Sequence, residues 1–84
     1  MNQAELAETV FAVIRDQAAT PEMEIRPDTP LGPDGLGIDS VGCLEIVLEL
    51  ERRTGRPLRD ENLTAESLAT PAGLIRLLEQ AGHG

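Results

Sequence analysis

Two residues that could carry chemistry, Asp39 and Ser40, stand where a loop rich in glycine and proline meets an apolar, acidic helical pattern. A serine or aspartate at a helix start most often caps the helix, because its side chain accepts a hydrogen bond from the first turn. A serine hydroxyl in this place could also carry a phosphodiester, since free N–H groups and the helix dipole favour added negative charge. The pair therefore allows a structural or a chemical role.

The rest of the sequence offers no machinery that would use this hydroxyl. His83, the single histidine, lies one residue from the C-terminus, where it cannot be held as a general base, so no hydrolase and no catalytic residue is expected. Cys43 is expected to pack as a small apolar residue rather than act as a nucleophile. The scattered aspartates lack metal-ligand spacing, so we expect no metal site. A lone presentable hydroxyl is typical of a protein that other enzymes modify.

Size and charge narrow the class of protein further. The 84 residues fit a single small domain, 1–84, with little room for an enclosed active site. There are 15 acidic residues against 7 basic ones, all of them arginine, for a formal net charge of −8. That charge argues against nucleic acid and favours partners with basic surfaces. With no apolar run near the roughly 20 residues that span a bilayer and no secretory signal, we expect a cytoplasmic monomer with no membrane span.

The spacing of apolar residues and the cap residues predict an all-α fold. We expect a small four-helix bundle with three longer helices and one short helix. Asn2 and Glu5 would start the first helix, Gly55 would stop the second, and Thr70 with Pro71 would start the last. The predicted helices cover residues 3–18, Ser40 to Thr54, about 64–68, and Pro71 to Gly82.

The segment between the first two helices is predicted to be a long ordered loop. Its four prolines and three glycines forbid a continuous helix and give no clean strand pattern. A loop of about twenty residues is unusual in a compact domain unless it carries function. We expect the core to hold it through Ile25, Leu31, Leu36 and Ile38.

The second helix has more apolar surface than a bundle normally buries, which is a stripe about 100° wide. We assign one stripe to the core, namely Cys43, Ile46, Val47 and Leu50. A second set, called here the apolar strip, would face partners beside Ser40 unless the long loop covers it. The strip is Val41, Leu44 and Leu48, flanked by Glu45, Glu49 and Glu51. Carboxylates around a small apolar contact suit transient binding to basic partners.

The stretch LGPDGLGIDSV (residues 31–41), followed by the acidic helix, resembles the phosphopantetheine attachment region of acyl carrier proteins. The resemblance extends over nearly the whole chain and implies a right-handed four-helix bundle. It implies that a phosphopantetheinyl transferase moves 4′-phosphopantetheine from coenzyme A onto Ser40 of the Asp39-Ser40 pair. The thiol would then hold acyl groups as thioesters for acyl-loading enzymes, ketosynthases or other thioester-processing enzymes.

Departures from the family pattern favour a carrier of polyketide or related natural-product biosynthesis. Val41 replaces a common leucine, Gly42 weakens the first turn, and Arg52 with Arg53 stands where fatty acid carriers often continue an acidic run. A fatty acid carrier and a peptidyl or aminoacyl carrier remain alternatives. A small helical adaptor that binds one protein, with Ser40 only a cap, is the alternative from another class.

Overall fold

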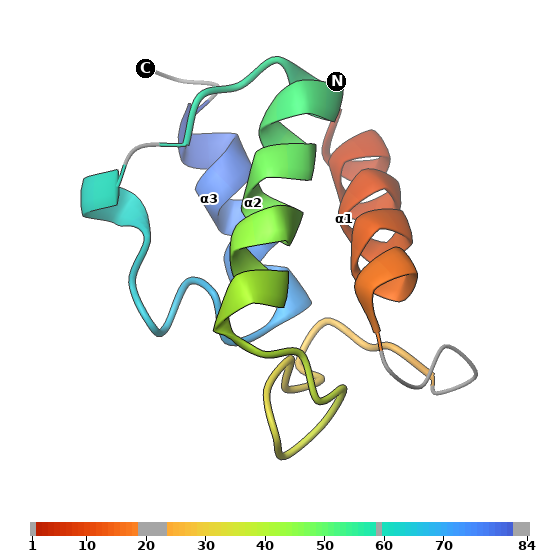
Figure 1. Cartoon of the computed structure of the whole chain (residues 1–84). Helices are drawn as coiled ribbons and strands as arrows, with labels where there is room; N and C mark the ends of the chain where they lie inside the picture. Colours follow the sequence, from red (N-terminus) through yellow and green to blue (C-terminus); the bar gives the residue numbers. More distant parts are fainter. Residues whose placement is uncertain (1, 19–23, 59, 82–84) are drawn as a thin grey trace.

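The computed structural model describes residues 2–18, 24–58 and 60–81. All of its regular secondary structure is helical. Among these residues there is no strand, so the predicted all-α class is confirmed. Figure 1 shows the α-helices side by side, with the long loop and the last residues before α3 at one end. The elements are α1 (Gln3–Gln17), α2 (Ser40–Thr54), the 3₁₀ helix η1 (Asp60–Asn62) and α3 (Pro71–Ala81).

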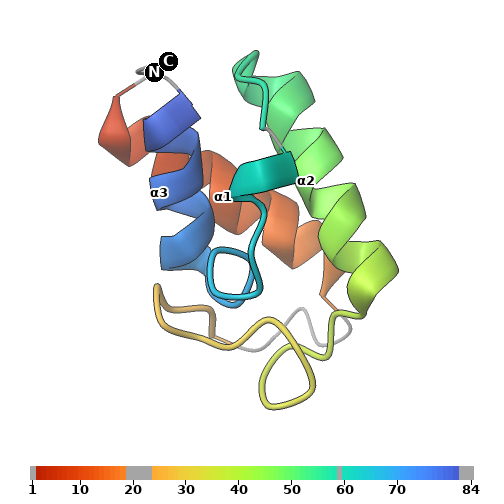
Figure 2. The same cartoon turned by 90° about the vertical axis from the view of Figure 1, so that its left-hand side faces the viewer.

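Helix α1 is the element on which the other two helices pack. It starts with the predicted capping box: the Asn2 side chain accepts from the Glu5 N–H at 2.9 Å, and the Glu5 carboxylate accepts from the Asn2 N–H at 3.3 Å. Figure 2 shows α1 behind and between α2 and α3, whereas α2 and α3 contact each other only slightly. The buried face of α1 consists of Leu6, Val10, Val13 and Ile14.

The predicted core of α2 is largely confirmed. Ile46, Val47 and Leu50 are buried on α2, while Cys43 packs against the core but stays half-exposed. On α3 the side chains of Leu74, Leu77 and Leu78 are buried, and Ile75 is partly buried. The hydroxyl of Thr70 accepts from the Gly73 N–H at 3.2 Å, as expected of a cap. The predicted stop at Gly82 lies outside the described residues.

The short helix predicted at 64–68 is absent, because this segment forms a turn. The Ser67 hydroxyl accepts from the Thr64 N–H at 2.9 Å and lies 3.0 Å from the Thr64 carbonyl oxygen. Such local bonds between side chain and backbone compete with helical bonds. One helix-like bond remains, from the Leu68 N–H to the Thr64 carbonyl oxygen at 3.1 Å. The described chain therefore has three α-helices and a single 3₁₀ turn at Asp60–Asn62 rather than four helices.

The long loop is held by the core as predicted. Leu31, Leu36 and Ile38 are buried and Ile25 is partly buried against the core. Backbone hydrogen bonds join the loop to the segment around the start of α3 and to itself. They run from the Leu31 N–H to the Ala69 carbonyl (2.9 Å), from the Ala72 N–H to the Pro27 carbonyl (2.9 Å) and from the Ile38 N–H to the Leu31 carbonyl (2.8 Å).

Truncating the two faces of α2 should have different effects on stability. Leu50 is fully buried, so Leu50→Ala should lower the free energy of unfolding by about 2 to 5 kcal/mol. Leu48 is 61% exposed, so Leu48→Ala should change it by less than about 1 kcal/mol. Urea unfolding followed by circular dichroism measures both. Equal losses would show that the apolar strip is buried in solution.

Candidate functional site

Asp39, and not Ser40, caps the N-terminus of α2. Its backbone is extended (φ −83°, ψ −179°), and its Oδ1 accepts from the Gly42 N–H at 2.7 Å. Its carbonyl accepts the first helical bond, from the Cys43 N–H at 2.9 Å. Asp39 therefore supplies the acceptor for one of the first-turn N–H groups that have no partner within the helix.

Ser40 is the first residue of α2, and its side chain is exposed. Within the described part of the chain its hydroxyl makes no hydrogen bond, so no structural contact holds it. The N–H groups of Ser40 and Val41 lie in the first turn, where α-helical N–H groups have no acceptor within the helix. The positive end of the helix dipole is at the same place, which favours a phosphate attached to this oxygen.

Close packing explains why position 42 is a glycine, which the sequence did not reveal. A Cβ at this position would lie 2.7 Å from Cγ2 of Ile38 and 3.3 Å from Oδ1 of Asp39. The first turn of α2 therefore lies directly against the end of the loop. The lower helix propensity of glycine is accepted here for close contact with the buried Ile38.

An open groove of about 550 Å³ lies beside Ser40 and is the site feature that sequence reasoning missed. Three segments line it: the long loop, the start of α2 and residues 63–69. Its walls are mainly apolar and include Leu44, Val47, Leu63 and Leu68. The apolar spacing of Leu63 and Leu68 was the available signal, but only the fold brings these residues next to Ser40.

Cys43 also lines this groove, one turn into α2. Burial and, to a lesser extent, the Asp39 carboxylate raise the pKa of its thiol. The thiolate is the nucleophilic form, so a raised pKa lowers the share of thiolate at neutral pH and does not favour a nucleophilic role. The interpretation of Cys43 as a packing residue agrees with its contact with the core.

The apolar strip is exposed, and the loop does not cover it. Val41 is 64% exposed, Leu44 58% and Leu48 61%, and these are the large hydrophobic side chains that the described residues leave in solvent. All three lie on one face of α2, starting directly after Ser40. An exposed apolar set on a single helix face is typical of an interaction surface.

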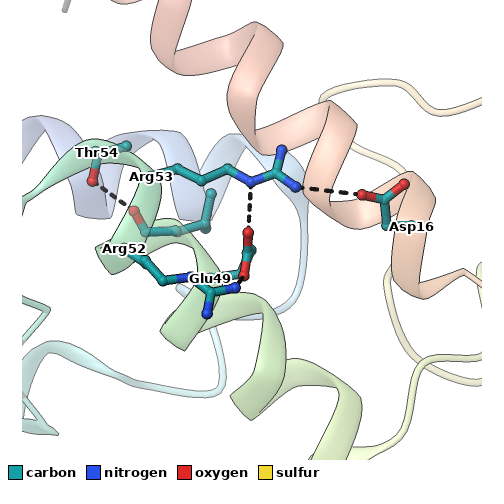
Figure 3. A network of polar contacts seen from close by, with 6 residues as sticks. Asp16, Glu49, Arg52, Arg53 and Thr54 are labelled. Carbon is teal, nitrogen blue, oxygen red and sulfur yellow. Dashed lines mark hydrogen bonds and ion pairs between the residues drawn. The ribbon is translucent and has the colours of Figure 1, made fainter.

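Of the three glutamates expected around the strip, Glu45 alone is free in solvent. It is exposed and takes part in no ion pair with the described residues. Figure 3 shows Glu49 between Arg52 and Arg53, with Arg53 also reaching Asp16 on α1. The Arg53 side chain donates to Glu49 at 2.7 Å and lies 3.5 Å from Asp16, and Arg52 binds the second oxygen of Glu49. Hydrogen bonds from Arg53 and then Arg52 hold the pKa of Glu49 below its ordinary value.

Glu51, the third glutamate expected beside the strip, has a contact within the chain. It is half-buried, and its Oε2 accepts from the Leu58 N–H at 2.9 Å. Gly55, with φ +69°, ends α2 in the left-handed conformation and turns the chain back so that Leu58 reaches this carboxylate. The prediction of Gly55 as the stop is confirmed, and it explains why Glu51 has a structural contact.

The part of the chain that the structure describes lacks the features of two other kinds of site. It contains no helix long and apolar enough to cross a bilayer. It also has no cluster of three or more His, Cys, Asp or Glu side chains that could hold a metal ion.

Comparison with known proteins agrees with this geometry. A family model described as "Phosphopantetheine attachment site" matches residues 8–78. The acyl carrier protein of Thermosynechococcus vestitus is 34% identical over 70 residues, which cover 83% of each chain. The acyl carrier protein of Chlorobium phaeobacteroides is 30% identical over 70 residues, which cover 83% of this chain and 86% of that one.

Substitution at the two adjacent positions tests which residue caps α2. Asp39→Ala removes the acceptor of the Gly42 N–H and should lower the free energy of unfolding by about 0.5 to 2 kcal/mol. Ser40→Ala is the matched control and should change it by less than about 0.5 kcal/mol, because the hydroxyl has no partner in the described chain. Urea unfolding measures both. A larger loss for Ser40→Ala than for Asp39→Ala would show that the cap is misassigned.

Proposed function

Because this chain belongs to the acyl carrier protein family of phosphopantetheine-binding domains, we propose that Ser40 carries the 4′-phosphopantetheine. The observation that carries the proposal is the exposed Ser40 hydroxyl at the N-terminus of α2, without a hydrogen-bond partner among the described residues. Asp39 supports it by taking over the capping bond. No other described serine has this combination, since the hydroxyl of Ser67 lies within hydrogen-bond distance of Thr64 and Asn62.

The residues around Ser40 fit this group. The hydroxyl oxygen would form the phosphodiester, and the helix N-terminus would stabilise the added negative charge. The groove beside Ser40 offers Leu44, Val47 and Leu68 as an apolar wall for part of the attached arm or its cargo. When attached, the group supplies a thiol that holds acyl intermediates as thioesters. The protein itself is a carrier rather than a catalyst, and other enzymes perform the reactions.

The partner surface in this proposal is the apolar strip with Glu45 beside it. A phosphopantetheinyl transferase, acyl-loading enzymes and ketosynthases must each approach Ser40, and the strip begins at the next residue. The small apolar contact would keep affinity modest, while the carboxylate of Glu45 would steer basic partners. Glu49 and Glu51 contribute less, because both are held by contacts within the chain.

We also propose that the pathway is polyketide or related natural-product biosynthesis rather than fatty acid synthesis. The supporting observation is the charge at the C-terminal half of α2. Arg52 and Arg53 there offset Glu49 and Asp16, so this half of the helix is not an acidic surface. Partners that recognise a continuous row of carboxylates would find Glu45 as the one glutamate of α2 without a contact among the described residues.

Ser40→Ala should abolish the modification. The test is intact-protein mass spectrometry after incubation with coenzyme A and a phosphopantetheinyl transferase of broad specificity. The unsubstituted protein should gain a single 4′-phosphopantetheine and Ser40→Ala should gain none. Ser67→Ala is the control and should be modified fully. If Ser40→Ala still gained the group, the attachment site would be elsewhere; if the unsubstituted protein gained none, the adaptor alternative would be favoured.

Charge reversal at Glu45 should weaken docking mainly through long-range attraction. Glu45→Lys should raise the KM of the transferase for this protein several-fold at low salt and less at high salt, because salt screens exposed charges. Glu8→Lys makes the same charge change on the exposed surface of α1 and is the control. Steady-state kinetics at two salt concentrations compare them. Equal effects of the two variants would point to net charge rather than a contact at Glu45.

A further inference from the structure

Arg52 lies on the same face of α2 as the apolar strip. It follows Leu48 by four residues, as Leu48 follows Leu44, and residues at this spacing are neighbours on a helix surface. The Arg52 side chain is 77% exposed. The strip therefore ends in a cation, with Glu45 beside its first half.

Arg52 belongs to a network of ion pairs on α2 and α1. Glu49 accepts from both Arg52 and Arg53, and Arg53 also pairs with Asp16. Two carboxylates thus face two guanidinium groups, and each carboxylate oxygen of Glu49 already accepts from one arginine. Arg52 makes its only described ion pair with Glu49, whereas a guanidinium has five N–H donors. Donors of Arg52 therefore remain available on the outer surface.

A protein that reaches Ser40 across the apolar strip would also cover Arg52. Ser40 and Arg52 are twelve residues apart on one helix, or about 18 Å at 1.5 Å per residue. This length fits within an interface patch of about 800 Å² per partner. Covering a guanidinium removes water from its free donors, which is costly unless the partner supplies acceptors. A carboxylate is the acceptor that matches the planar fork of arginine.

We propose that Arg52 is a specificity-determining residue of the docking face and binds a carboxylate on the phosphopantetheinyl transferase that modifies this protein. Glu45 faces a basic group on the same transferase. The surface thus selects a partner that places a basic group opposite Glu45, near Ser40, and an acidic group opposite Arg52, about two turns farther along α2. This inference rests on the proposed function of Ser40, and it adds a requirement that an all-acidic helix would not impose.

The test compares Arg52→Glu with Arg76→Glu. Arg76 is an exposed arginine on α3, so both variants make the same change in net charge at different places. The transferase of the source organism and coenzyme A are used, and kcat and KM for the carrier are measured at low and high salt. Arg52→Glu should raise KM by about five- to tenfold at low salt, with less effect at high salt and little change in kcat. Arg76→Glu should leave KM within about twofold.

Further measurements separate the possible causes. Arg52→Gln removes the charge without adding repulsion and should give an intermediate KM, and circular dichroism checks that each variant is folded. A KM for Arg52→Glu equal to or below that of Arg76→Glu would overturn the inference while leaving Ser40 as the attachment site. If the transferase did not modify the unsubstituted protein, or modified it at a residue other than Ser40, the result would instead contradict the proposed function.

Discussion

The hydrogen bond from the Leu31 N–H to the Ala69 carbonyl is the contact on which the position of Ser40 depends. It joins the middle of the long loop to the residues just before α3. The Ile38 N–H then bonds back to the Leu31 carbonyl, and the side chains of Leu31, Leu36 and Ile38 are buried. The end of the loop is thereby fixed against the core, and α2 begins two residues after Ile38. A long connection of this kind costs conformational entropy, which these buried contacts offset.

Two adjacent residues have different roles at the start of α2. Asp39 accepts from the Gly42 N–H in the first turn, and the Ser40 hydroxyl is left exposed without a partner among the described residues. The two faces of this helix also differ: Ile46 and Leu50 pack in the core, whereas the apolar strip faces solvent. A short helix in a small domain can thus contribute to stability and present an interaction surface without conflict between the two.

The features that were predicted correctly depend on local pattern. The starts of α1 and α2 follow from caps within the first turn, and the two faces of α2 follow from helical periodicity. The features that were missed depend on contacts that the sequence does not place together. Glu51 accepts from a residue seven positions away beyond a turn, and the groove is built from three separate segments. At residues 64–68, bonds between the Ser67 hydroxyl and the backbone prevailed over a weak helical pattern.

The central place of α1 has a mechanical consequence for the groove. Helices α2 and α3 each pack on α1 but contact each other only slightly, and the groove beside Ser40 lies between the start of α2, the long loop and residues 63–69, which precede α3. A small rotation of α2 about its contact with α1 would widen the groove and leave the interface of α1 with α3 intact. Such a rotation would also move the close contact of Gly42 with Ile38 and the bond from the Leu58 N–H to Glu51, so the width of the groove is coupled to both ends of α2.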